Sequence, residues 1–227
     1  MLKRGTAGRR VGLIAGLTAA GLLFAGGIAF AASETIVAGP GESFSQATYN
    51  ADQGAVVQFQ DLGGSHNVTV RQTGPDGKAL FRSATISGGI TGVDGTQYVT
   101  TGDYAFFCTV HPTTMNGTLH VTGAGTALPR PQATLSLKSK SLSKAIKKGV
   151  LVSINTTTKV DGATLTAKLG KTTIGKATVS LAAGSQAKLV KLSKAGKSKL
   201  RGRETAKVTV TANIPFGSPA STKAKLS

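Results

Sequence analysis

Short segments in which apolar and polar residues alternate run through the first half of the chain. In residues 55–61, Val57 and Phe59 alternate with glutamines, the period of two that gives a strand one buried face. We predict strands at 34–38, 43–49, 55–61, 66–72, 78–83, 96–100, 103–108 and 118–122. Glycine pairs and a Pro-Asp-Gly turn separate them. Evenly spaced short strands of this kind predict a two-sheet antiparallel sandwich.

The same alternation returns in the second half of the chain. It predicts strands at 133–139, 149–156, 163–169, 186–193, 207–214 and 222–227. Residues 192–203, LSKAGKSKLRGR, fit either a short helical turn or a basic loop. Six or seven strands in about a hundred residues predict an immunoglobulin-like sandwich. The fold class is therefore all-β throughout.

The N-terminus has the pattern of an export signal. Basic residues precede an apolar run from Val11 to Ala32, and Ala29-Phe30-Ala31 fits a small-x-small cleavage site. We predict a signal peptide at 1–31, with an uncleaved membrane anchor as the alternative. Arg9 and Arg10 also fit a twin-arginine signal. The rest of the chain is expected to be exported, as an extracellular, periplasmic or envelope-associated protein.

Charge divides the chain into unequal parts. Residues 1–31 carry a formal +4, residues 32–128 carry −4 and residues 129–227 carry +18. Pro129 and Pro131 flank Arg130 near the change of sign. We predict a first domain at 32–124, a linker at 125–131 and a basic domain at 132–227.

The basic domain suggests a polyanionic partner. Its charge exceeds what solubility requires, which favours binding to an anionic envelope polymer or an anionic membrane surface. The alternative is a solvated surface that protects edge strands from aggregation. No nucleic acid is expected, because the protein is exported and no aromatic stacking platform accompanies the lysines.

Metal-binding chemistry is concentrated in one stretch, YAFFCTVHPTTMNG at 104–117. It holds Cys108, the only cysteine of the chain, together with His111 and Met115, and His66 lies upstream in GGSHNVTV. Structural cysteines of exported proteins come in pairs, so a single one needs another explanation. Thiolate, imidazole and thioether together are a donor set that suits copper.

The pair of motifs SHNVTV and YAFFCTVHPTTMNG resembles the type 1 blue copper proteins of the plastocyanin, amicyanin and pseudoazurin kind, the cupredoxin family. The resemblance covers residues 34–122 and implies a Greek-key sandwich holding one type 1 copper. It implies His66, Cys108, His111 and Met115 as the ligands. It also implies that Asn67 braces the ligand loop, with Thr109 as a candidate partner, and that the edge of His111 reaches the surface through an apolar patch. His120 is expected to be a surface or hydrogen-bonded histidine without a metal role.

We therefore expect electron transfer, with copper alternating between Cu(I) and Cu(II) and a redox partner protein. Two alternatives stay open: a non-redox copper-binding or delivery protein, and an envelope-attachment protein acting through the basic domain. No enzymatic activity is expected. The chain has three histidines, too few for a second copper centre beside the first, and no convincing Ser-His-Asp set or phosphate-binding glycine loop is present.

Overall fold

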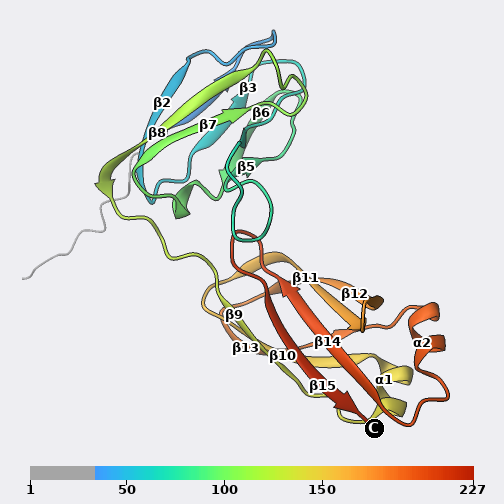
Figure 1. The fold of residues 1–227 in the computed structure, drawn as a ribbon. Helices are drawn as coiled ribbons and strands as arrows, with labels where there is room; N and C mark the ends of the chain where they lie inside the picture. The colour runs from blue at the N-terminus through green and yellow to red at the C-terminus, as the bar shows by residue number, and fades with distance from the viewer. Residues whose placement is uncertain (1–33) are drawn as a thin grey trace, which may run out of the picture.

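The computed structural model describes residues 34–227, and the predicted signal peptide at 1–31 lies outside this range. Within it the chain forms fifteen strands, two short α-helices and one 3-10 turn, so the all-β prediction is confirmed. Figure 1 shows two bodies of strands, one above the other. Each body has its own apolar core. No helix among these residues has both the length and the apolar character needed to cross a bilayer.

The eight strands of the first body form one sheet that curls until its two edges meet. Their order is β1-β3-β6-β5-β4-β7-β8-β2. The Tyr49 hydroxyl on β2 donates to the carbonyl of Val37 on β1 at 3.0 Å and accepts from its N–H at 3.3 Å, which joins the two edges. The strands are β1 (Thr35–Ala38), β2 (Thr48–Gln53), β3 (Gln58–Asp61), β4 (Thr69–Val70), β5 (Arg82–Ser83), β6 (Gly89–Asp94), β7 (Gly102–Phe107) and β8 (Asn116–Gly125).

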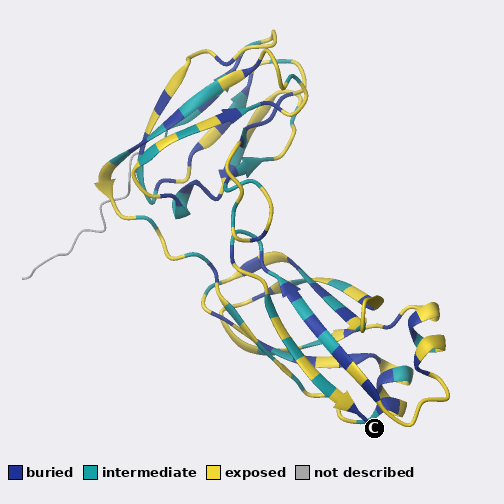
Figure 2. Ribbon diagram, viewed as in Figure 1, coloured by how far each residue is buried: buried dark blue, intermediate teal, exposed yellow. Residues whose placement is uncertain are grey.

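Alternation along these strands separates the core from the solvent, as Figure 2 shows. On β3, Phe59 and Asp61 are buried while Gln58 is exposed. On β7, Phe106 is buried while Ala105 is exposed. The alternation continues one step beyond β7 and places Cys108 inside, with no exposed surface. The predicted inward direction of the thiol is confirmed.

Two predictions for the first body need correction. Residues 96–100 do not form a strand, because Thr96–Tyr98 is a 3-10 turn that follows Gly95 in a left-handed conformation. The buried Thr96 hydroxyl accepts a hydrogen bond from the N–H of Val57 at 3.0 Å, a long-range contact that alternation cannot reveal. Strand β6, GITGVD, was not predicted because its two glycines and few apolar residues hide the period.

The second body is a sandwich of two antiparallel sheets, the arrangement of immunoglobulin-like domains. One sheet has the order β13-β10-β9 and the other β12-β11-β14-β15. The strands are β9 (Ala133–Leu137), β10 (Val150–Thr156), β11 (Val160–Leu169), β12 (Thr172–Leu181), β13 (Gly184–Val190), β14 (Ala206–Asn213) and β15 (Ala220–Leu226). Strand β12 was not predicted.

Two short helices close one end of this sandwich. Helix α1 (Leu142–Lys148) was not predicted, and α2 (Lys194–Leu200) decides the open choice at 192–203 in favour of a helix. Each begins at a serine whose hydroxyl accepts a backbone N–H, Ser141 and Ser193 respectively. Alternation does not predict such short helices, because a single turn or two cannot show the helical period.

The two bodies meet at Phe216, in the turn between β14 and β15. Its N–H donates to Asp76 Oδ2 at 3.1 Å, and the guanidinium of Arg82 lies 4.3 Å from its ring centre. Arg130 donates to the carbonyl of Phe216 and to the carbonyl of Tyr98, both at 3.2 Å. Residues from both bodies and from the connection between them therefore hold this joint together.

Candidate metal centre

The loop between β7 and β8 holds Cys108, His111 and Met115. The N–H of Cys108 donates to the carbonyl of Met115 at 3.0 Å, and the N–H of Met115 donates to the carbonyl of His111 at 3.0 Å. The strand ladder below it is paired as far as Phe107 and Asn116. These bonds close the loop at its base and fix the three side chains relative to one another.

The sulfur of Cys108 lies 4.0 Å from Nδ1 of His111. Metal bonds of about 2.3 Å to sulfur and about 2.0 Å to nitrogen, the values for zinc, separate the two donor atoms by roughly 3.5–3.9 Å at angles of about 110–130°. The observed distance is slightly larger than this range. A small inward movement of His111 is enough to let both atoms contact one ion.

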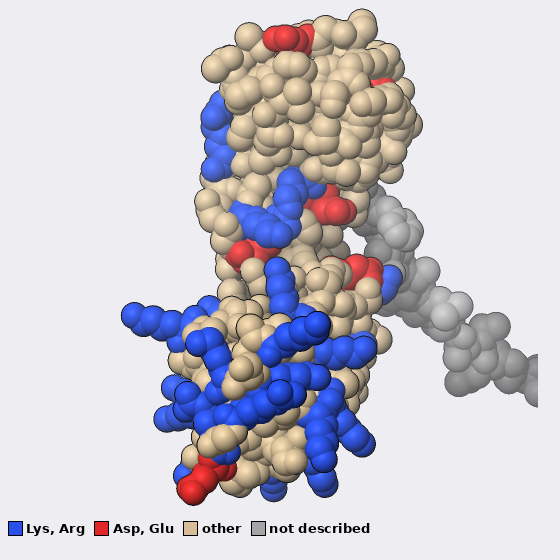
Figure 3. Space-filling view, turned by 90° about the vertical axis from the view of Figure 1, so that its right-hand side faces the viewer, with Lys and Arg blue, Asp and Glu red and all other residues tan. Residues whose placement is uncertain are grey.

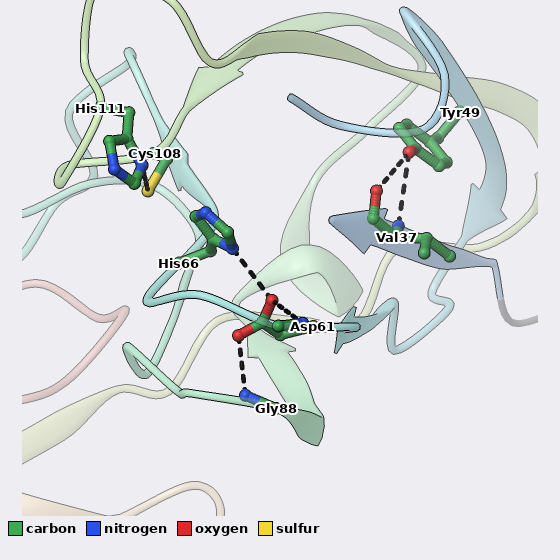
Figure 4. A network of polar contacts seen from close by, with 8 residues as sticks. Val37, Tyr49, Asp61, His66, Gly88, Cys108 and His111 are labelled. Atoms are coloured by element: carbon green, nitrogen blue, oxygen red, sulfur yellow. Dashed lines mark hydrogen bonds and ion pairs between the residues drawn. The ribbon is translucent and has the colours of Figure 1, made fainter. Parts of the chain in front are cut away.

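His66 faces the same loop from the other side of the body. Its Nδ1 lies 2.9 Å from Oδ1 of Asp61, and its ring centre lies 5.1 Å from that of His111. Two imidazoles sharing an ion at about 2.0 Å have ring centres roughly 5 Å apart. Figure 4 shows the His66 ring between Asp61 on one side and Cys108 with His111 on the other.

Asp61 determines which nitrogen of His66 is available. Burial raises the pKa of Asp61, but hydrogen bonds from the N–H of Gly88, the His66 ring and the N–H of Gly63 outweigh burial, so the pKa is lower than its ordinary value. An ionised carboxylate only accepts hydrogen bonds. The proton of neutral His66 therefore lies on Nδ1, and Nε2 keeps the lone pair that a metal needs.

Gly64 packs directly against the His66 ring. A Cβ at this position would overlap ring atom Cε1, and the backbone φ of +111° also disfavours any side chain. The close approach limits the positions that the imidazole can take.

Asn67 connects the strand of His66 to the cysteine loop. Its side-chain oxygen accepts from the N–H of Thr109 at 2.9 Å, and its side-chain nitrogen donates to the hydroxyl of Thr109 at 2.6 Å. The same nitrogen donates to the hydroxyl of Thr85 at 2.8 Å. The expected contact between Asn67 and Thr109 is present, and it fixes the start of the loop.

The outer edge of His111 reaches the surface beside a carboxylate. The His111 side chain is 22 % exposed, and its Nε2 lies 3.8 Å from Oε1 of Glu42. Thr114 of the same loop donates to Glu42 Oε2 at 3.0 Å. Val110 is an exposed apolar neighbour in the loop. The expected apolar patch is thus corrected: this edge is bordered by an acid as well as by apolar surface.

The donor set has the chemistry of a copper site. His66, Cys108 and Met115 are buried, so water is largely excluded from two soft sulfur donors and one imidazole. Within residues 34–227, however, no three His, Cys, Asp or Glu side chains are close enough to hold an ion as they stand. The side chains must therefore close slightly to bind one, and the thioether of Met115 lies outside that residue set.

The remaining histidine stands apart from these donors. The His120 side chain is 45 % exposed and its Nδ1 lies 2.6 Å from Asp103 Oδ1. It is a surface histidine with a partner, as expected.

Sequence reasoning missed two side chains near the donors, Asp61 and Glu42. A signal for Asp61 exists, because it continues the inward series after Val57 and Phe59. An acid at an inward position of a strand needs a buried partner. No pattern points to Glu42, which lies in an irregular segment.

Comparisons with known proteins give likenesses to solved structures alone. No family model matches the chain, and no curated protein matches it. An oxidised amicyanin variant is 17% identical, with a TM-score of 0.30, covering 40% of this chain and 82% of that chain. A reduced Cu(I) form of another amicyanin variant is 22% identical, with a TM-score of 0.29, covering 40% and 85%. Because these TM-scores are low, the metal assignment rests on the side chains described above.

Proposed function

We propose that the first body binds one copper ion through His66, Cys108, His111 and Met115, and that the protein is an exported electron carrier with no enzymatic activity of its own. The supporting observation is that Cys108 Sγ lies 4.0 Å from His111 Nδ1, in a loop closed by two backbone hydrogen bonds. Copper bound there supplies a one-electron couple between Cu(I) and Cu(II).

The residues around the donors favour a rigid site. Asp61 holds the His66 ring, and Asn67 fixes the first residue after Cys108. A site whose ligands are held in place changes little when an electron arrives, and partners of ligands tune the potential. The exposed edge of His111, beside Glu42, is the proposed contact point for a redox partner protein.

A redox titration of the copper-loaded full chain tests this function. The expected result is a reversible one-electron couple, with the same potential in the oxidative and reductive directions and no loss of copper over repeated cycles. Bound copper that is released on reduction, or that cannot be reoxidised, contradicts electron transfer. That outcome favours the copper-delivery alternative.

A further inference from the structure

The positive charge of the second body is confined to the half that carries α1 and α2. We define this distal half as residues 138–152, 168–174, 188–209 and 223–227. It contains seventeen of the twenty Lys and Arg residues between 129 and 227; the exceptions are Arg130, Lys159 and Lys176. Its single acid is Glu204, so its formal charge is +16.

Strand pairing shows that this half is the end remote from the joint. Phe216 in the turn between β14 and β15 marks the joint end. At the other end of the same ladder, Ala206 pairs with Leu226, and Ser227 accepts the N–H of Leu142 at the start of α1 at 2.8 Å. Figure 3 shows the basic side chains projecting from this body and few from the first.

These charges have no internal acidic partners. Within residues 34–227, the second body forms one ion pair, Lys159 with Asp161, and both residues lie outside the distal half. Like charges so close together repel one another, which destabilises the folded domain unless counterions or a ligand compensate. Stability of the fold therefore does not explain their accumulation.

Exposed lysines lie on the outer faces of both sheets. A hollow of about 520 Å³ beside α1 on the three-stranded sheet is bordered by Lys138, Lys140, Lys144 and Lys148. On the four-stranded sheet, Lys207 of β14 and Lys223 and Lys225 of β15 are exposed. The outer faces of a two-sheet sandwich look in opposite directions.

This distribution fits a flexible polymer better than a membrane. A flat bilayer reaches one face at a time, whereas a flexible chain can pass around the end of the domain. The second body also has no exposed aromatic wedge for a bilayer, because its single aromatic residue, Phe216, lies in the joint. For the same reason it offers no platform for stacked bases.

We propose that the distal half binds a linear, flexible polyanion that carries phosphate or similar anionic groups and no bases, and that this polymer contacts the outer faces of both sheets around the α1–α2 end. The candidate metal centre follows the far end of β7, whose first residues lie near Tyr98 at the joint. Polymer bound at the distal half thus leaves the metal-binding end of the molecule free (Figure 1).

Binding of long-chain inorganic polyphosphate to the full chain, measured by titration calorimetry at several salt concentrations, tests the proposal. One double variant, Lys144→Gln with Lys148→Gln, removes charge from one face. Another, Lys207→Gln with Lys225→Gln, removes charge from the opposite face. The matched control, Lys78→Gln with Lys159→Gln, removes the same charge outside the distal half. All six lysines are exposed, and circular dichroism verifies the fold of each variant.

The expected result is binding whose logarithm falls linearly with the logarithm of salt concentration. Each distal variant should reduce that slope by about two, since one neutralised phosphate contributes roughly 0.9 on DNA. The control should leave the slope unchanged, and Lys→Arg at the distal positions should restore it. Absence of polyphosphate binding, or equal losses in the control, overturns the proposal. So does dependence on one face alone, tighter binding to anionic phospholipid vesicles, or tighter binding to single-stranded DNA of equal charge.

Discussion

Asp61 holds the ring of His66 through a 2.9 Å contact between Oδ1 and Nδ1, and both residues are almost completely buried. The carboxylate is itself fixed by the N–H groups of Gly63 and Gly88, at 3.1 and 2.8 Å. Three interactions thus set the orientation of one proposed copper ligand from the side opposite the metal. Partners of this kind decide how well a histidine binds.

Asp61→Asn should weaken copper binding by about 10–100-fold, because the ring loses its charged acceptor and Nε2 becomes less basic. A competition titration against a chelator of known affinity measures the change. Asp103→Asn is the matched control, since Asp103 makes the equivalent contact with surface His120. Equal copper affinities in the two variants contradict the role of Asp61, provided that both unfold at the wild-type temperature without metal.

Gly64→Ala should reduce copper binding by displacing the His66 ring, because the new methyl group overlaps Cε1. Gly63→Ala supplies the comparison. Gly63 also has a positive φ, +150°, but the nearest atom to its Cβ position is 3.7 Å away on Pro40. Backbone strain is therefore present in both variants and the clash with His66 in one. Copper titration that finds the same loss in both argues against His66 as a ligand.

Glu42→Gln should raise the reduction potential of the bound copper. A carboxylate 3.8 Å from the outer nitrogen of His111 stabilises the more positive oxidised ion. Coulomb's law in a watery environment gives an effect on the order of 30 mV. Voltammetry at low salt measures it, and Glu204→Gln in the second body controls for the change in net charge. A potential that stays the same, or falls, is incompatible with this arrangement.

Acid should loosen the joint between the two bodies. Burial raises the pKa of Asp76, but hydrogen bonds from the N–H groups of Phe216 and Lys78, together with Arg82, outweigh burial and lower it below the ordinary 3.8. The contribution of a group with a lowered pKa is complete above its ordinary pKa and is lost as the pH falls through the lowered value. We expect the joint to be intact at neutral pH and to weaken below about pH 4.

Small-angle X-ray scattering between pH 6 and pH 2 measures this change as an increase in the radius of gyration. Asp76→Asn should show the looser form already at pH 6, with little further change on acidification. Asp161→Asn is the control, since Asp161 is an exposed acid of the second body. An acid expansion that is the same in wild type and Asp76→Asn removes Asp76 from the joint.

Period-two alternation predicts the all-β class and the burial of Phe106 and Cys108 well, because those features depend on residues close in sequence. The curled sheet depends on Tyr49 contacting Val37, and the joint depends on Phe216 contacting Asp76. These pairs are twelve and 140 residues apart, and no local period encodes them. Helix α1 escaped prediction because seven residues are too few to display a helical face.

The donor residues themselves can be named from the sequence, because three of them lie within one short loop. Their spacing in the structure, and the Asp61 partner, arise from the way β3 and β7 face one another across the core. Glu42 is unpredictable for a plainer reason: it lies in an irregular segment far from the loop in sequence and contacts His111 through tertiary structure alone. The asymmetry of charge within the second body likewise emerges only from the strand register.

The most direct test of the account is the visible absorption spectrum of the full chain loaded with Cu(II), recorded beside Cys108→Ser. An intense visible band that is present in the wild type and lost in the variant establishes a bond between the thiolate and copper. Cys108→Ser that still binds copper weakly through His66 and His111 agrees with the account. A wild-type spectrum without such a band, or one unchanged by the substitution, contradicts the proposed copper centre.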